Sequence, residues 1–140
     1  MQLLSKAIIL ATKTHDDQLD KAGKSYILHP LRVMMKVDSI DMKIVAVLHD
    51  VLEDTELTKE DLLREGFSQE IVETIECLTR KENESYMDFI KRCKINYMAK
   101  IVKLADLEDN SDLSRIENPT EKDYDRLKKY KKATNELLYG

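Results

Sequence analysis

Two apolar segments of the sequence carry ionisable residues where a protein core is expected. His49 and Asp50 follow an apolar run, and Asp106 lies inside the apolar segment 101–107. A buried carboxylate without a partner is very costly, so such groups are paired with a cation, protonated or bound to a metal ion. These positions therefore admit two interpretations. They form buried ion pairs, for example between Asp106 and Lys103, or they form a metal site.

A histidine at the start of a predicted helix favours the metal site. His29 stands directly before Pro30, a residue that suits the first turn of a helix. A single histidine in an apolar helix is usually a hydrogen-bonded core residue. Together, however, His29, His49, Asp50 and Asp106 would offer two imidazole nitrogens and two carboxylates. This mixed set suits Mn²⁺, Fe²⁺ or a similar divalent ion, whereas closed zinc sites more often contain thiolates. We predict that these four residues bind such an ion.

Two further acidic residues, Glu53 and Asp54, lie four positions after His49 and Asp50. On a continuous helix, each pair at this spacing would share a face. From there a carboxylate could orient or deprotonate a water molecule whose pKa a metal ion has lowered. The alternative is that both residues form a solvated helix end. We take Glu53 and Asp54 as candidate catalytic residues.

The elements that must position these residues are predicted to be helices. The chain has 140 residues, only 3 glycines and 2 prolines, and no segment that alternates with the period of a strand. Expected helix limits are residues 3–14, a start at Pro30 with His29 as N-cap, 41–55, Thr58 to Gly66, a start after Ser68, one long or two abutting helices over 85–110, and Thr120 to the end. Tyr86, Phe89 and Tyr97 are expected in the core. The predicted fold is all-α, a single irregular bundle of seven to nine helices that forms one domain over residues 1–140.

Charge and cysteine content restrict the possible partners and location. The net charge is −4, and only residues 128–132 form a short basic cluster, so we expect no nucleic-acid binding. No apolar run approaches the length of a membrane span, and no secretory signal is visible. Cys77 and Cys93 lack metal-binding spacing and suggest a reducing compartment. We therefore expect a cytoplasmic protein with no membrane association.

An ordered set of short motifs resembles the HD-type hydrolase domain of the RelA/SpoT family, which includes single-domain small alarmone hydrolases. The motifs are His-x-x-Gln at 15–18, Lys-x-Gly at 21–23, Tyr-Ile-Leu-His-Pro at 26–30, His-Asp-Val-Leu-Glu-Asp-Thr at 49–55, and Lys-Leu-Ala-Asp at 103–106 followed by Asn110. With the last helix included, the resemblance covers nearly the whole chain. It implies an all-α HD domain, a Mn²⁺ ion, and hydrolysis of the 3′-pyrophosphate of ppGpp and pppGpp.

The resemblance also implies roles for individual residues. The metal ligands would be His29, His49, Asp50 and Asp106, and the attacking water would be handled by Glu53 and Asp54. Lys21 and Asn110 match positions that contact the nucleotide or its phosphates. Arg126 and Tyr130 match an Arg-x-x-x-Tyr pair that faces the substrate in the last helix, although an ordinary amphipathic helix would show the same spacing.

Two departures from the family pattern leave the substrate open. Asp20 stands where the family usually has an arginine that stacks on the base, and residues 107–110 read Leu-Glu-Asp-Asn, which makes this region acidic. The substrate could be ppGpp, ppApp, NADPH or another phosphorylated nucleotide, and a non-catalytic, metal-stabilised binding module is a further alternative. We expect degradation without synthesis, because the sequence ends at Gly140 without a synthetase segment. His15 either lies behind the ligand site or is a surface residue.

Overall fold

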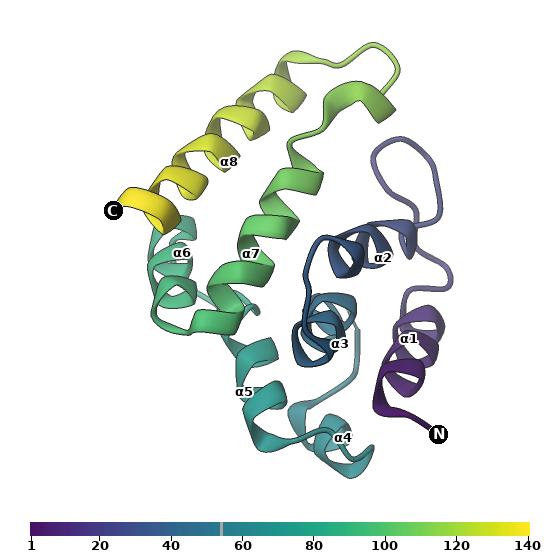
Figure 1. The fold of residues 1–140 in the computed structure, drawn as a ribbon. Helices are drawn as coiled ribbons and strands as arrows, with labels where there is room; N and C mark the ends of the chain where they lie inside the picture. Colours follow the sequence, from purple (N-terminus) through teal and green to yellow (C-terminus); the bar gives the residue numbers. More distant parts are fainter. Residues whose placement is uncertain (54) are drawn as a thin grey trace.

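The chain folds into helices joined by loops (Figure 1), in a computed structural model that describes residues 1–53 and 55–140. Over these residues the α-helices are α1 (Leu3–Thr14), α2 (Leu28–Met35), α3 (Ile40–Leu48), α4 (Lys59–Arg64), α5 (Gln69–Cys77), α6 (Tyr86–Ile95), α7 (Tyr97–Asn110) and α8 (Glu121–Tyr139), with a 3-10 turn at Leu113–Arg115. In the described residues, β-structure is limited to one bridge between Leu19 and Ser25. The all-α prediction and the expected number of helices are confirmed.

Local sequence signals set several helix ends where we expected them. Thr58 and Asp61 form a reciprocal capping box at the start of α4, and the Ser68 hydroxyl accepts a hydrogen bond from the first turn of α5. Gly66 follows α4 with a φ of 103°, a conformation that favours glycine. The segment 85–110 forms two abutting helices, because Asn96 has extended backbone angles and caps α7.

Helix α3 lies at the centre of the molecule. Its residues Ile44–Leu48 are at most 1% exposed, and the helix packs against α1, α2, α5 and α7. An apolar helix of this kind is stable only when other elements cover all its faces. The residues that directly follow its last turn therefore lie in a region that is closed on several sides.

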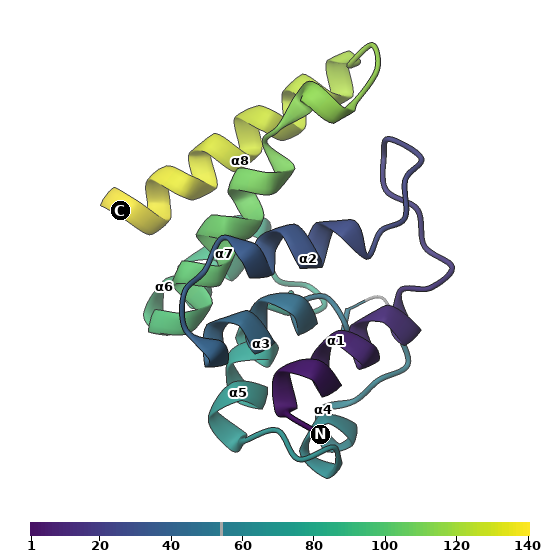
Figure 2. The same ribbon diagram turned by 45° about the vertical axis from the view of Figure 1, so that its right-hand side comes forward.

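Helix α7 is the second element that positions the site. It packs against α2, α3, α5 and α6, and α8 runs back along it (Figure 2). The loop between α1 and α2 lies near the end of α7, on the opposite side of that helix from α8 (Figures 1 and 2). Helices α2, α3 and α7 thus converge at one place, and each brings polar residues there.

The described residues include no helix with the length and apolar character that a membrane crossing requires.

Candidate metal centre and adjoining cavities

The predicted metal ligands come from three helices and meet in the protein interior. His29 lies in the first turn of α2, His49 and Asp50 directly follow α3, and Asp106 lies on α7. His29 was expected at the N-cap of a helix that starts at Pro30, but this prediction is wrong because the helix begins two residues earlier, at Leu28. The residues His29, His49 and Asp106 are each at most 4% exposed.

The ligand atoms of these residues lie close enough to share one cation. His29 Nε2 and His49 Nε2 lie 2.9 and 3.3 Å from the same Asp106 oxygen. Asp50 Oδ2 lies 3.1 Å from His49 Nε2 and 4.0 Å from His29 Nε2. One donor atom each from His29, His49 and Asp50 falls within 4.8 Å of the others. The structure therefore brings together all four predicted ligands.

The orientation of the two imidazoles fits a metal ion. His49 Nδ1 donates to the Ala46 carbonyl at 2.6 Å, and His29 Nδ1 donates to Asp109 at 2.7 Å. Each Nε2 then faces carboxylate oxygens, and His29 Nε2 lies 2.9 Å from Asp106 Oδ1. His49 Nε2 is buried and makes no hydrogen bond of acceptable geometry in the described structure, although Asp50 is only 3.1 Å away. Converging lone pairs repel one another unless a cation lies between them, so this donor set fits a divalent ion.

Charge keeps the carboxylates of the site ionised. Burial alone would raise the pKa of Asp50, but the charge and hydrogen bond of His49, together with the charge of His29, lower that pKa to about 2. Burial also opposes ionisation of Asp106, yet Lys103 and His49 hold its pKa well below the usual range. Conversely, burial opposes protonation of His49, and the carboxylates of Asp50 and Asp106 raise its pKa well above the usual value. The ionised carboxylates of the cluster therefore stabilise a positive charge placed among them.

The ion-pair interpretation of Asp106 is also realised. Lys103 Nζ lies 2.8 Å from Asp106 Oδ2, while the other oxygen of Asp106 faces the two histidines. Asn110 donates to that second oxygen at 3.1 Å. Asp106 therefore uses one oxygen for a structural ion pair and offers the other to the ligand cluster.

Asp109 supports the site and was not predicted from the sequence. Its carboxylate is 2% exposed and accepts from His29 Nδ1, and it also accepts from Arg32 at 2.8 and 3.1 Å. Arg115 lies 3.5 Å away. The available signal was spacing, because Asp109 follows Asp106 by three positions and so shares its helix face. These contacts balance the negative charge of Asp109. The acidic segment 107–110 therefore does not make the neighbouring pocket negative, contrary to our expectation.

Glu53, one of the two candidate catalytic residues, lies on a turn and not on a helix. Helix α3 ends at Leu48, so the expected shared helix face of His49 and Glu53 is wrong. The Glu53 carboxylate accepts from the Arg80 backbone N–H at 3.4 Å. Glu53 lines a cavity of about 240 Å³ together with Asp50 and other residues, and we call this the inner cavity. The prediction for Asp54 falls outside the described residues.

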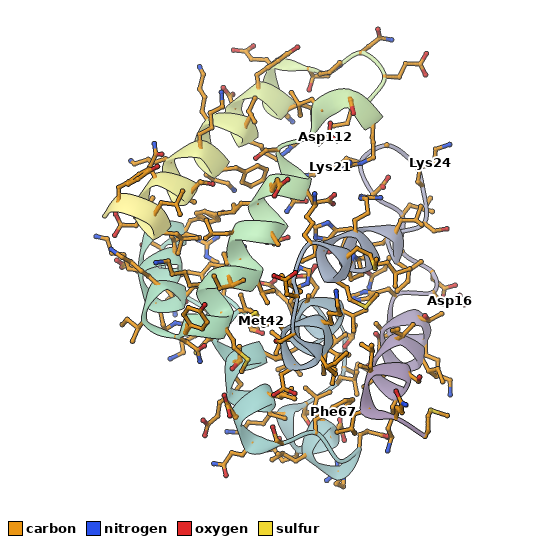
Figure 3. All side chains as sticks on the ribbon, viewed as in Figure 1. Asp16, Lys21, Lys24, Met42, Phe67 and Asp112 are labelled. Carbon is orange, nitrogen blue, oxygen red and sulfur yellow. The ribbon has the colours of Figure 1, made fainter. Side chains whose placement is uncertain are left out.

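The four predicted substrate-binding residues line one neighbouring cavity of about 300 Å³, which we call the outer cavity. Lys21 comes from the loop after α1 and Asn110 from the end of α7, and Arg126 and Tyr130 come from α8. Lys21 lies in the same region as Asp112, another residue of this cavity (Figure 3). Burial and the nearby cation Arg126 lower the pKa of Lys21.

The outer cavity carries more positive charge than the sequence suggested. Asp20 lies in its wall, but its carboxylate accepts from the backbone N–H groups of Ala22 and Lys24, so it shapes the loop. Arg32 and Arg115 also line the cavity, and neither was predicted there. Tyr26, His29, Asn110 and Tyr130 line both cavities, so the two adjoin at the metal ligands.

Several aromatic residues differ from their predicted environment. His15 is 1% exposed and stacks against Tyr26, whose hydroxyl donates to Asp50, so His15 lies behind the ligand site and not on the surface. Phe89 is buried as expected. Tyr97 is 71% exposed, because it begins α7 and faces solvent. Tyr86 is half-buried in the wall of the inner cavity, not in the core.

Similarity to known proteins agrees with this geometry. A family model described as the HD domain matches residues 7–105. A guanosine-3′,5′-bis(diphosphate) 3′-pyrophosphohydrolase of Aquifex aeolicus is 31% identical over 119 residues, which cover 76% of this chain and 17% of that protein. A protein of the same name from Borreliella burgdorferi is 38% identical over 79 residues, which cover 54% of this chain and 12% of that protein. The chain thus spans about a sixth or less of the length of these curated relatives.

A solved structure shares the fold over the full length. It is described as a metazoan ortholog of SpoT that hydrolyses ppGpp and plays a role in starvation responses. The two structures superpose with a TM-score of 0.80, at 21% identity, over 100% of this chain and 87% of the other. The resemblance to the RelA/SpoT family that the motifs indicated is confirmed.

Proposed function

Since the chain belongs to the HD domain family, we propose that it is a metal-dependent phosphohydrolase that removes the 3′-pyrophosphate of guanosine alarmones such as ppGpp. The observation that carries the proposal is the convergence of His29, His49, Asp50 and Asp106 around one point, beside two cavities lined with cations. Mn²⁺ is the ion we propose, because nitrogen and carboxylate ligands with room for water suit it. The whole of residues 1–140 would act as one domain, in the cytoplasm.

The proposed mechanism assigns each step to a side chain. A divalent cation at the ligand cluster would lower the pKa of a bound water molecule and polarise a phosphate oxygen. Glu53 lines the inner cavity with Asp50, and it would accept the proton of the attacking water. Asp54 would act with it. His29 and His49 would hold their Nε2 atoms toward the cation, because their Nδ1 atoms are bound to Asp109 and Ala46.

Cations of the outer cavity would hold the nucleotide. Lys21 and Arg126 would contact phosphate oxygens, since charge-assisted hydrogen bonds to phosphate are among the stronger polar contacts in proteins. Tyr130 and Asn110 lie where the two cavities adjoin, and they would contact the sugar between the reacting phosphate and the base. This placement would align the scissile bond with the metal ligands.

A second substrate class is favoured by one feature of the outer cavity. Asp20 occupies the position of the family's base-stacking arginine, and it lines this cavity. Without that arginine, the preference for guanine would be weakened, and ppApp, NADPH or another phosphorylated nucleotide would compete. The metal chemistry would be the same, whereas the released product would differ.

A direct assay separates these possibilities. Mn²⁺-loaded protein is incubated with ppGpp, ppApp and NADPH, and released pyrophosphate and phosphate are measured. We expect pyrophosphate from ppGpp, and loss of this activity in Asp106→Ala and Asp106→Asn, with the helical circular dichroism of both variants checked. If the loaded protein leaves ppGpp intact but cleaves another nucleotide, the alarmone assignment is wrong. If the loaded protein cleaves none of these nucleotides, and Glu53→Ala and Asp54→Ala leave ligand affinity unchanged, the binding-module alternative is favoured.

A further inference from the structure

The inner cavity contains a group of cations for which the proposed mechanism has given no role. Arg80 follows α5, Lys103 lies on α7 and Lys129 lies on α8, and all three line this cavity together with Glu53. They are separated by 23 and 26 positions along the chain, so no sequence motif joins them. Only the packing of α7 and α8 beside the loop after α5 brings them to one place.

The three cations surround the ring of Tyr86. Lys129 Nζ lies 4.5 Å from the ring centroid, Arg80 Cζ 5.8 Å and Lys103 Nζ 6.0 Å. Contact with an aromatic face stabilises an exposed cation by only about 0.5–1 kcal/mol. Three positive charges around one ring repel one another, so the ring alone does not explain why they gather there.

Two of these charges lack a carboxylate partner. Lys103 is neutralised by Asp106 at 2.8 Å. Neither Arg80 nor Lys129 has a carboxylate within ion-pair distance among residues 1–53 and 55–140. Burial is the main cause of the lowered pKa of Lys129, and the nearby cations Arg80 and Lys103 lower it further. An anion would relieve this repulsion.

A buried hydroxyl in the same wall points to the same kind of ligand. The Tyr86 hydroxyl is enclosed and has no hydrogen-bond partner in the described structure. A buried donor that makes no hydrogen bond costs roughly 1–3 kcal/mol, and a phosphate oxygen would supply the missing acceptor. The cavity therefore combines two cations that form no ion pair within the described residues, one unused donor, and the predicted metal ligands in its wall.

We propose that Arg80 and Lys129 bind the terminal phosphate of a diphosphate ester whose inner phosphate lies at the metal ligands. This inference rests on the proposed function and makes the inner cavity selective for a diphosphate over a monophosphate. In the reaction, the oxygen of water bonds to the inner phosphorus, and the bond from that phosphorus to the ribose 3′ oxygen breaks. The 3′ oxygen gains a proton, and pyrophosphate is released from the inner cavity.

Binding of inorganic anions tests the site without any turnover. Pyrophosphate and phosphate are titrated calorimetrically into Mn²⁺-loaded protein at low salt, and the heat of each anion with Mn²⁺ alone is subtracted. Because charge-assisted hydrogen bonds are about twice as strong as neutral ones, we expect Lys129→Gln and Arg80→Gln each to lower pyrophosphate affinity by roughly 5–10-fold. Phosphate affinity should change little. Lys128→Gln removes an exposed charge from the next position of α8 and is the matched control.

The outcomes distinguish this site from the proposed function. Pyrophosphate that binds no tighter than phosphate, or affinity that is equal in Lys129→Gln and Lys128→Gln, would overturn the inference. If pyrophosphate binds selectively through Lys129 but no nucleoside 3′-diphosphate is cleaved, the diphosphate site stands and the alarmone hydrolase assignment fails. If both hold, the ratio of kcat/KM for a nucleoside 3′-diphosphate to that for a 3′-monophosphate should fall in Lys129→Gln and stay constant in Lys128→Gln.

Discussion

Removal of the Asp109 carboxylate should weaken metal binding without unfolding the protein. Asp109 accepts from His29 Nδ1 at 2.7 Å, and this contact directs His29 Nε2 toward Asp106. Its other contacts go to Arg32 and Arg115, whose side chains are 30% and 33% exposed and can be solvated when the carboxylate is lost. The perturbation therefore acts mainly on the orientation and basicity of one ligand.

The size of the effect follows from the contacts that each variant removes. Loss of an outer partner of a metal-bound histidine typically weakens metal affinity by about 10–100-fold. We expect this range for Asp109→Ala, which is roughly 1.4–2.7 kcal/mol of binding free energy. Asp109→Asn keeps a neutral acceptor for His29 Nδ1, and a neutral hydrogen bond is about half as strong as a charge-assisted one. We therefore expect a smaller loss, of about 3–10-fold.

Calorimetric titration with Mn²⁺ measures these affinities independently of any substrate. Asp112→Ala is the matched control, because Asp112 lies three residues further along and also pairs with Arg115, at 3.1 Å, but does not contact His29. Circular dichroism verifies that each variant is folded. Wild-type affinity in Asp109→Ala, or equal losses in Asp109→Ala and Asp112→Ala, would refute the role assigned to Asp109.

Three further predictions concern stability and reactivity. Mn²⁺ should raise the thermal midpoint, with about 2.7 kcal/mol of stabilisation at 100 times its Kd, and calorimetry should show no such shift for His49→Ala. Hydrogen bonds from Arg92 lower the pKa of Glu84 to about 2, so this contact stabilises the fold above the ordinary pKa of 4.5 and is lost as the pH falls toward 2. The free energy of unfolding in urea, measured at pH 3 and pH 7, should therefore depend less on pH in Glu84→Gln than in the wild type. Equal pH dependence in the two proteins would contradict this. Burial raises the pKa of the Cys93 thiol to about 11. This thiol should therefore resist a thiol reagent at pH 8 until urea unfolds the protein. Rapid labelling of Cys93 in the native state would argue against its burial.

Much of the fold could be predicted because its signals are local. Helix caps at Thr58 and Ser68 and the stop at Gly66 depend on a few neighbouring residues, and each lies where the sequence indicated. The predicted limits of α2 and α3 were less accurate than these. Helix α3 stops at Leu48 although the sequence remains apolar at Val51 and Leu52, and the His49 ring donates to the Ala46 carbonyl at that end.

The sequence by itself identified the candidate metal ligands. Burying an ionisable side chain without a partner is costly in any fold. His49, Asp50 and Asp106 can therefore be recognised as unusual from their apolar sequence neighbours alone. The structure then brings them to within about 4 Å of one another or of His29.

Only the tertiary structure decided which groups support and surround those ligands. The bond from Asp109 to His29 spans 80 residues, and Arg80 and Lys129 meet across the inner cavity from separate elements. Each of these residues is an ordinary charged side chain in its local sequence, where solvent exposure would explain it equally well. Their roles arise from long-range packing of α2, α7 and α8, which fixes distances and excludes water, and no local pattern encodes those distances.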